Sequence, residues 1–531
     1  MSSNRSFLRV VVIVVIALIM AACGSSKDTS SSSAASGNVS IALTDAPAFG
    51  YDHVWITVND IRFHASDTAG PGDGGWRKYP LDAPVTVDLL TLANGTTQTV
   101  WNALSLPTGQ YQQIRLHLAP TFAQNPPAGH EFFNEVVVGA NTYPLRIPDA
   151  QHGIMLAGSF AVVEGGTLRL AIDFDAGNDV VDARHNGVIE YVLKPRLAYF
   201  DLDDSGAILG RIDAIASGMA QTARFVIKAE QVGSLSTNND VYTVRRATTV
   251  KADGSFILYP LKPGNYDIVM RGVNYQTVIL RNVPVVKGSS PVAGATVIPQ
   301  ITMNAASTPD YSVRASIVSP TGAWIDFYQT LPGESASHQI RFRHFNPFTG
   351  AFSGFLMSSD SVRVGLYSTG TVTLAATTPV EGNGGYRAAA DTILYDRGPF
   401  SMITSTMTGT VVFSALNVQP PASTRSISGS IVMSAGMMNQ MDTGILFAVR
   451  GGMVVNTMSI NGLIGQGGAY TMLNLPGGTV AQPRPGAVYG VEAVGWSAMS
   501  PTTVRALAVP AIADLRTSNA TGTDLNMILM P

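Results

Sequence analysis

Cysteine is almost absent from this chain: Cys23 is the only one among 531 residues. An internal disulfide is therefore excluded, and with it a disulfide-stapled fold. Charge is also scarce, because Asp, Glu, Lys and Arg together make up 13% of the residues, about half the usual share for a soluble protein. The formal net charge of −3 offers no basic surface for nucleic acid, so we expect no nucleic-acid partner.

Long apolar runs are missing as well, except near the N-terminus. There, Arg5 and Arg9 precede an unbroken apolar stretch from Val10 to Met20, and the small residues Ala21 and Ala22 follow it. This stretch is too short for a permanent membrane-spanning helix. It predicts a cleaved signal peptide over residues 1–22.

The segment from Met20 to Cys23 resembles the lipobox of bacterial lipoproteins, although Met20 stands where Leu or Val is usual. The resemblance implies that Cys23 becomes a lipidated (palmitate-bearing) N-terminus, followed by a Ser-rich tether over residues 23–37. It also implies a lipid anchor in the cell envelope, and Gly24 in place of Asp points to the outer membrane. An ordinary signal peptide with an incidental cysteine is the alternative.

From Asn38 onward, apolar and polar residues alternate with a period of two, as in Val39 to Leu43 and in Leu168 to Phe174. Strict alternation is typical of strands that bury one face, and Gly- and Pro-rich turns separate these strands. The sequence shows no long amphipathic helical pattern. It therefore predicts an all-β protein of tandem antiparallel β-sandwich domains.

The first of these domains carries an ordered set of motifs. They are LTDAP (43–47), Trp76, TVDLLTLANG (86–95), LPTGQYQQIRL (106–116), LRLAIDFDAG (168–177) and VLKPRL (192–197). The set resembles the domain-of-unknown-function family 4382 of secreted bacterial and archaeal lipoproteins. The resemblance implies a β-sandwich over residues 38–204 and an envelope location, but no activity.

A second set of motifs follows this domain. GRIDA (210–214) and ADGSFILYPLKPGNYDIVMRG (252–272) resemble the carboxypeptidase-regulatory-like domain, which implies a transthyretin-type sandwich over residues 205–305. Segments 312–317, 428–431 and 468–478 echo this unit, so we expect further sandwich-like domains over 306–420 and 425–531. Asp204-Ser205-Gly206 is expected to be an exposed boundary.

Catalytic motifs are incomplete. Residues 70–75 match G-x-G-x-x-G but no helix follows them, and His130-Glu131 lacks the second histidine of a zinc-protease helix. We therefore expect no catalytic residue and a non-enzymatic protein for ligand binding, adhesion or envelope structure. The alternative is an accessory or catalytic hydrolase component that acts on envelope or extracellular carbohydrate or peptide, with Asp173 and Asp175 as its candidate acid pair.

Two acidic clusters are candidate calcium ligands: Asp173, Asp175 and Asp179 around one strand end, and Asp201 and Asp203 at the first domain boundary. Closely spaced carboxylates suit Ca²⁺, and turn capping is the alternative. We expect no other cofactor.

Four further residues are candidates for a ligand surface. Arg115 and His117 share a polar strand face, and Trp55 and Trp76 are expected to be exposed aromatic residues. Such a surface would take a saccharide or a protein. Ordinary packing at the sheet surface is the alternative.

Overall fold

The computed structural model describes residues 35–529 with gaps. The gaps are residues 47, 185–189, 214–223, 233–240, 289–291, 307–310, 318–321, 332–333, 357–360, 376–377, 380–385, 393–397, 399, 403–409, 417, 419–422, 434–440, 465–467, 479–486, 498 and 500–504. The signal peptide, Cys23 and most of the tether therefore lie outside the described residues. No helix among those described is long and apolar enough to cross a membrane.

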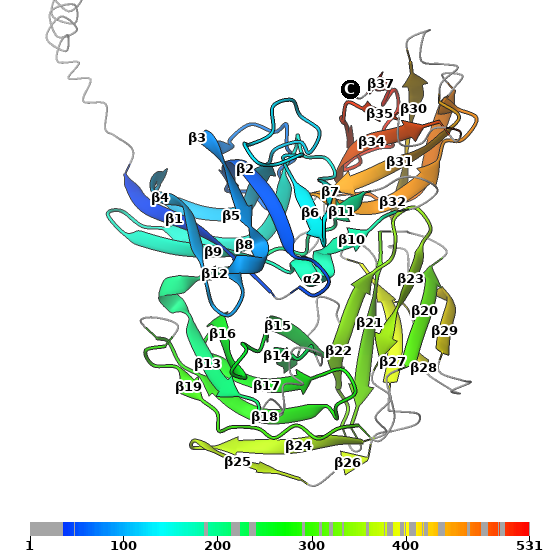
Figure 1. The fold of residues 1–531 in the computed structure, drawn as a ribbon. Helices are drawn as coiled ribbons and strands as arrows, with labels where there is room; N and C mark the ends of the chain where they lie inside the picture. Colours follow the sequence, from blue (N-terminus) through cyan, green and yellow to red (C-terminus); the bar gives the residue numbers. More distant parts are fainter. Residues whose placement is uncertain are drawn as a thin grey trace, which may run out of the picture.

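The described part folds into four β-sandwich units, which follow the chain from blue to red in Figure 1. We call them units 1 to 4. The α-helix of the described part, α2 (Ala176–Asp179), is four residues long. The prediction of an all-β protein built from β-sandwiches is confirmed.

Unit 1 packs two sheets face to face. One has the strand order β12-β9-β1-β4, and the other has the order β10-β11-β7-β6-β2-β5-β8, with β3 paired to β2. The strands are β1 (Ser36–Asp45), β2 (His53–His64), β3 (Arg77–Asp88), β4 (Gln98–Pro107), β5 (Gly109–Leu118), β6 (Glu135–Val138), β7 (Asn141–Arg146), β8 (Ile154–Val162), β9 (Thr167–Phe174), β10 (Val180–Asp182), β11 (Tyr191–Leu193) and β12 (Ala198–Asp201), with a 3₁₀ turn η1 (Leu89–Leu92).

Units 2 and 3 follow after the 3₁₀ turn η2 (Leu202–Asp204). Unit 2 consists of β13 (Gly206–Arg211), β14 (Val226–Val232), β15 (Val241–Thr249), β16 (Ser255–Leu261), β17 (Gly264–Arg271), β18 (Val278–Val285) and β19 (Thr296–Val297). Unit 3 consists of β20 (Tyr311–Ile317), β21 (Trp324–Thr330), β22 (Ser337–His344), β23 (Ala351–Leu356), β24 (Ser361–Ser368), β25 (Thr371–Leu374), β26 (Thr378–Pro379), β27 (Tyr386–Asp391), β28 (Ser401–Met402) and β29 (Thr410–Leu416).

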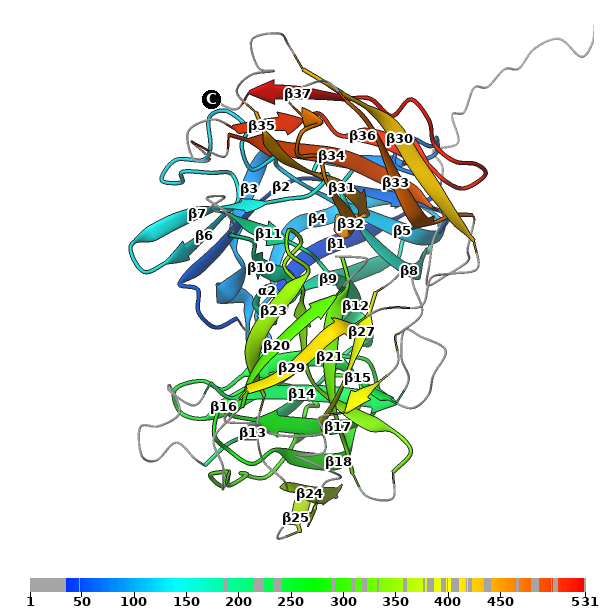
Figure 2. The same cartoon turned by 90° about the vertical axis from the view of Figure 1, so that its right-hand side faces the viewer.

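Unit 4 ends the described chain and lies beside unit 1 (Figure 2). It consists of β30 (Thr424–Val432), β31 (Thr443–Arg450), β32 (Met453–Ser459), β33 (Ala469–Pro476), β34 (Val488–Trp496), β35 (Arg505–Ala508), β36 (Ala511–Asp514) and β37 (Leu525–Leu529).

All four units follow one pairing rule. The first strand pairs antiparallel with the fourth and parallel with a strand near the end of the unit: β1 with β4 and β9, β13 with β16 and β19, β20 with β23 and β29, and β30 with β33 and β37. Segments 312–317 and 428–431 lie in the first strands β20 and β30, and segment 468–478 covers β33, the equivalent of β16. The echoes seen in the sequence therefore fall at equivalent positions.

Units 2 and 3 share a sheet. Its strand order is β25-β24-β18-β17-β14-β15-β22-β21-β27-β28, and both β24 and β22 of unit 3 pair in parallel with edge strands of unit 2. This sheet runs across residue 305, where one domain was expected to end. Ser205, expected at an exposed boundary, is instead 1% exposed, and its carbonyl accepts a hydrogen bond of 3.0 Å from the amide of Gly288.

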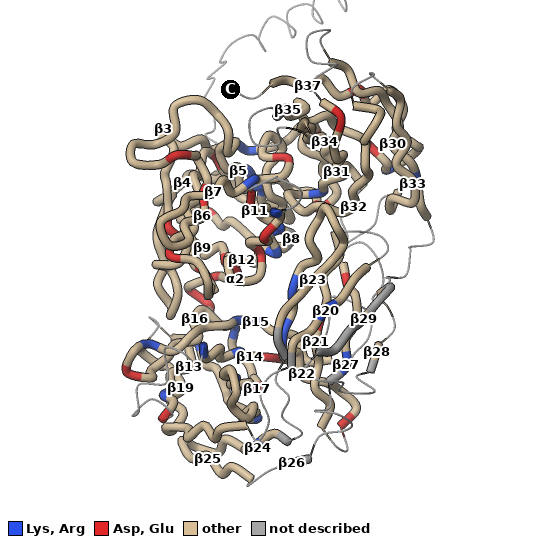
Figure 3. The backbone as a smooth tube through the Cα atoms, turned by 45° about the vertical axis from the view of Figure 1, so that its right-hand side comes forward, with Lys and Arg blue, Asp and Glu red and all other residues tan. Residues whose placement is uncertain are grey.

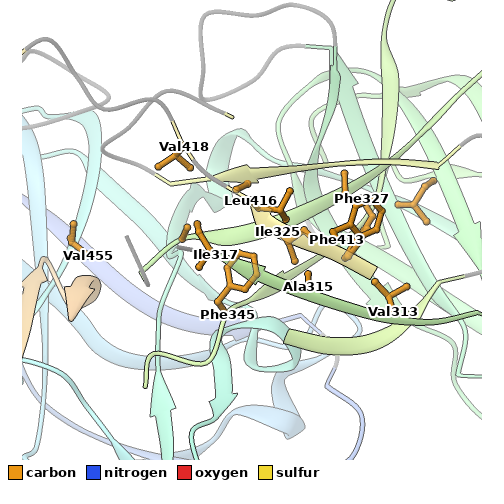
Figure 4. Packing of buried hydrophobic residues seen from close by; sticks show 14 of the residues in the cluster. Val313, Ala315, Ile317, Ile325, Phe327, Phe345, Phe413, Leu416, Val418 and Val455 are labelled. Carbon is orange, nitrogen blue, oxygen red and sulfur yellow. The ribbon is translucent and has the colours of Figure 1, made fainter. Parts of the chain in front are cut away.

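The buried apolar residues form one cluster inside unit 1, a second that runs through units 2, 3 and 4, and a small third one within unit 4. Figure 4 shows part of the second cluster, where side chains from β20, β21 and β29 interleave. Ile317, Phe327 and Phe413 come from these three strands, and Val455 of β32 belongs to the same cluster. Apolar burial therefore continues from one unit to the next.

Candidate functional site

A cavity of about 620 Å³ lies where unit 1 meets units 2 and 3, and we call it the junction cavity. Unit 1 contributes α2 and the loop after β1, unit 2 contributes β14, β15 and β17, and unit 3 contributes β22. Figure 1 shows α2 between unit 1 and these strands. The lining residues are Phe49, Asp175, Gly177, Asn178, Arg224, Val226, Lys228, Ala247, Arg271, Val273, Asn274, Ile340, Arg341 and Arg343.

The lining is strongly cationic. It includes Arg224, Lys228, Arg271, Arg341 and Arg343, whereas Asp175 is the one carboxylate among the described lining residues. Figure 3 shows the basic residues in blue, with α2 above β14 and β22. This concentration of positive charge stands out in a chain whose formal net charge is −3.

Two of these cations are partly buried and donate hydrogen bonds to backbone carbonyls. Lys228 Nζ donates a hydrogen bond of 2.6 Å to the carbonyl of Ile340, and Arg343 Nη1 donates one of 2.9 Å to the carbonyl of Phe342. Burial lowers the pKa of Lys228 to about 8 and the pKa of Arg343 to about 10. The neighbouring guanidinium of Arg271 contributes to both low pKa values, whereas Glu230 raises the pKa of Lys228 and Asp175 raises that of Arg343.

The carboxylate of the cavity lining, Asp175, comes from the turn that joins β9 to α2. Asp175 Oδ2 accepts a hydrogen bond of 2.6 Å from Asn178 Nδ2, and Asn178 Oδ1 accepts one from Arg343 Nη1. Burial raises the pKa of Asp175, while the charges of Arg343 and Lys228 act in the opposite direction. The carboxylate therefore lies within the electrostatic field of the cationic wall.

A buried ionic contact next to the cavity attaches unit 2 to unit 1. Arg246 of β15 donates hydrogen bonds to Thr44 Oγ1 at 2.9 Å and to the carbonyl of Asp45 at 3.1 Å, and it pairs with the carboxylate of Asp173. Burial lowers the pKa of Arg246 to about 10. Asp173 is thus engaged by unit 2.

The candidate calcium ligands do not converge on one centre. Asp173 pairs with Arg246, Asp175 bonds to Asn178, and Asp179 accepts a hydrogen bond of 3.1 Å from the amide of Arg196. In the second cluster, Asp201 accepts a hydrogen bond of 2.9 Å from the amide of Asp203, and Asp203 accepts one of 2.8 Å from Arg169 Nε. The described residues contain no group of three His, Cys, Asp or Glu placed to hold a metal ion.

The candidate ligand surface is mostly buried. Arg115 is 5% exposed and His117 4% exposed, and burial lowers the pKa of His117 to about 4. The guanidinium of Arg115 lies 5.3 Å from the ring centroid of Trp76, so these two residues do meet. Trp55 lies elsewhere and stacks on His53 at 5.5 Å. Arg115 and His117 therefore do not lie on an open strand face.

The cationic residues of the junction cavity were missed by the sequence analysis. They are spread from residue 224 to residue 343 over two units, and no short motif links them. The only local signal is Arg341-Phe342-Arg343, whose spacing of two puts both arginines on one face of β22.

Several solved structures match this chain at low identity. A type II cohesin–X-dockerin complex from Acetivibrio cellulolyticus matches 19% of this chain at 19% identity with a TM-score of 0.14, and the chain spans 58% of the length of that protein. A streptococcal ancillary pilin matches 61% of this chain and 99% of its own at 10% identity, with a TM-score of 0.17. Two B repeat units of the collagen-binding protein of Staphylococcus aureus match 93% and 99% of the two chains at 9% identity, with a TM-score of 0.13.

No curated protein matches the chain. A family model does match most of unit 1, from β1 to β11. Residues 36–195 match the family described as "Domain of unknown function (DUF4382)", which confirms the resemblance found in the ordered motifs of the first domain.

Proposed function

We propose that this chain is a lipid-anchored, non-enzymatic binding protein of the cell envelope, and that the junction cavity is its ligand site. The cavity carries the proposal. Its volume of about 620 Å³ falls within the range of small-molecule sites, and such sites often lie where domains meet.

The residues in the cavity suit binding better than turnover. None of the described lining residues carries a hydroxyl, thiol or imidazole group, which are the usual nucleophiles and proton carriers. Lys228 and Asp175 both hold fixed hydrogen bonds, to the carbonyl of Ile340 and from the amide of Asn178. Asp173, the other member of the candidate acid pair, is engaged by Arg246.

The anchor belongs to the same proposal. The leader over residues 1–22, the lipobox-like segment and Cys23 support attachment through a lipid, with the outer membrane as the location. Unit 2 serves in this proposal as a carboxypeptidase-regulatory-like accessory sandwich, which completes the cavity instead of performing chemistry. The ligand is a saccharide or a segment of another envelope molecule.

A binding screen with a blocked cavity tests the proposal. A soluble form that begins at Gly24, and so keeps all of β1, is screened against glycans and small envelope molecules by thermal shift, next to Val273→Trp and Val292→Trp. Val273 lines the cavity, whereas Val292 is 64% exposed on the same unit. We expect ligands that stabilise the wild type and Val292→Trp but not Val273→Trp. Equal stabilisation of all three proteins would contradict the assignment of the site.

The non-enzymatic part has its own test. A broad hydrolase screen on the same soluble form is run beside Asp173→Asn/Asp175→Asn. Turnover that this variant abolishes without a change in its melting temperature would overturn the proposal.

A further inference from the structure

We infer that the ligand of the junction cavity is an anion that carries at least two negative charges on carboxylate or phosphate groups. This inference rests on the proposed function and adds the chemical class of the ligand. It follows from the charge, the register and the size of the cavity.

The charge of the lining is unbalanced. Five of the 33 Lys and Arg residues of the chain line this one cavity, and Asp175 is the single carboxylate among the described lining residues. Like charges close together in a partly desolvated space repel one another, because the low dielectric weakens screening. The positive excess therefore disfavours the empty cavity and favours an anion that neutralises more than one cation.

The pKa values of the cations show the same crowding. Burial is the main cause of the low pKa of Lys228; the carboxylate of Glu230 acts in the opposite direction, and the positive charges of Arg271 and Arg343 lower the pKa. For Arg343, burial lowers the pKa, Asp175 raises it and Arg271 lowers it. These cations therefore interact electrostatically at short range, so a single ligand can contact several of them at once.

Strand register leaves room between the cations. In the shared sheet, Lys228 of β14 pairs directly with Ala247 of β15. On its other side β15 pairs with β22 through Val241 and Tyr242, and further along β22 the residues Arg341 and Arg343 line the same cavity as Ala247. Ala247 has a short side chain, so the strand between the two cationic strands does not fill the space. An anion that lies over Ala247 is flanked by basic residues on both sides.

The types of cation narrow the ligand further. A planar guanidinium forms paired hydrogen bonds with carboxylate and phosphate, and four of the five cations are arginines. Lys228 uses one of its donors on the carbonyl of Ile340, so its ammonium group retains donors for a ligand. The volume of about 620 Å³ is ample for a molecule with two separated anionic groups.

Calorimetric titration of the soluble form tests the inference. The probes are citrate for carboxylates, fructose 1,6-bisphosphate for phosphates, and the neutral sugar fructose. We expect binding of at least one of the two anions and none of the neutral sugar. Binding of citrate alone or of the bisphosphate alone identifies which group the cavity prefers.

Three variants test whether charge controls the affinity for the anion. Lys228→Met removes a cavity cation and is expected to weaken anion binding at least tenfold. Asp175→Asn keeps the shape of the only acidic residue in the described lining but removes its charge, so binding should tighten severalfold. Arg77→Gln is the control, because Arg77 is exposed on β3 and lies outside the cavity lining; it should leave binding unchanged. Unchanged melting temperatures exclude misfolding of the variants.

Two results overturn the inference in different ways. If neutral ligands bind in a manner that Val273→Trp abolishes, and anions do not, the cavity is a binding site of another class and the proposed function survives. If no ligand of any class responds to Val273→Trp, both the inference and the proposed function fail.

Discussion

Arg146 and Glu492 stand 346 positions apart in the chain and form a buried ion pair, with 2.9 Å between Arg146 Nη2 and Glu492 Oε1. Arg146 ends β7 of unit 1, and Glu492 lies on β34 of unit 4. The second carboxylate oxygen accepts a hydrogen bond of 3.2 Å from the amide of Asp149, and the guanidinium lies 4.7 Å from the ring centroid of Phe447. The first and last units are therefore joined directly.

This pair predicts a large difference between removing the cation alone and removing it together with its carboxylates. Arg146→Met leaves Glu492 buried without its cation and should reduce the free energy of unfolding by about 3–5 kcal/mol. Glu190 Oε1 also lies 3.7 Å from Arg146 Nη1, so Arg146→Met/Glu190→Gln/Glu492→Leu removes all three charges and should recover most of that loss. Urea unfolding measures both. Arg184→Met is the control, because Arg184 and Asp182 form a pair of half-exposed side chains, which contributes at most about 1 kcal/mol. Equal losses in Arg146→Met and Arg184→Met would contradict the prediction.

Lys194 predicts a dependence of stability on pH. Burial lowers its pKa to about 7, whereas a lysine in an unfolded chain titrates near pH 10.4. Between these values the unfolded chain holds a proton that the folded chain has released. The contribution of Lys194 to stability therefore rises with pH, by at most about 1.4 kcal/mol per pH unit.

Urea midpoints at pH 7, 8 and 9 check this dependence, with Lys194→Met as the comparison. The difference in stability between wild type and variant should change in favour of the wild type as the pH rises. A difference that stays constant over this range would show that Lys194 keeps an ordinary pKa in the folded chain.

At the contact between units 3 and 4, the space around Gly322 is too small for a side chain. The amide of Gly322 donates a hydrogen bond of 3.1 Å to the carbonyl of Val455, and a Cβ on Gly322 would collide with the backbone carbonyls of Val454 and Val455. Gly322→Ala should therefore cost about 1–3 kcal/mol, as overpacking does elsewhere. Gly74→Ala, where a Cβ meets no atom within 4 Å, should be neutral. Thermal unfolding of both variants distinguishes the two outcomes.

Cys23 predicts lipidation. Radiolabelled palmitate should enter the wild-type protein in cells, and Cys23→Ser should carry no label, because the cysteine is the expected acceptor. Equal labelling of the two proteins would contradict lipidation at Cys23.

Local pattern was enough to predict the class of fold. Alternation in Val39, Ile41 and Leu43 corresponds to three fully buried side chains of β1, because a strand places every second residue on the same face. Turn residues and motif order then identified the first domain. Both kinds of signal act over a few residues, and a single sequence displays them directly.

The candidate site could not be predicted in this way. Alternation of apolar and polar residues distinguishes the two faces of a strand, but it does not show whether the polar face is exposed to water or covered by another unit. Arg115 and His117 share a polar face of β5, yet segments that are distant in sequence cover it. The amide of Met155 bonds to the carbonyl of Gly451 in unit 4, and Arg516 pairs with Asp73. Asp173 likewise has its partner, Arg246, on another unit. Such partners are fixed by how the units dock.

The sheet shared by units 2 and 3 limits how this protein can be rearranged. Residues 206–297 have the size of a portable module, but their edge strands β15 and β18 both border strands of unit 3. Transplanted alone into another chain, they would carry two open sheet edges, which recruit foreign strands and promote aggregation. A recombination event that preserves the fold must therefore move units 2 and 3 together.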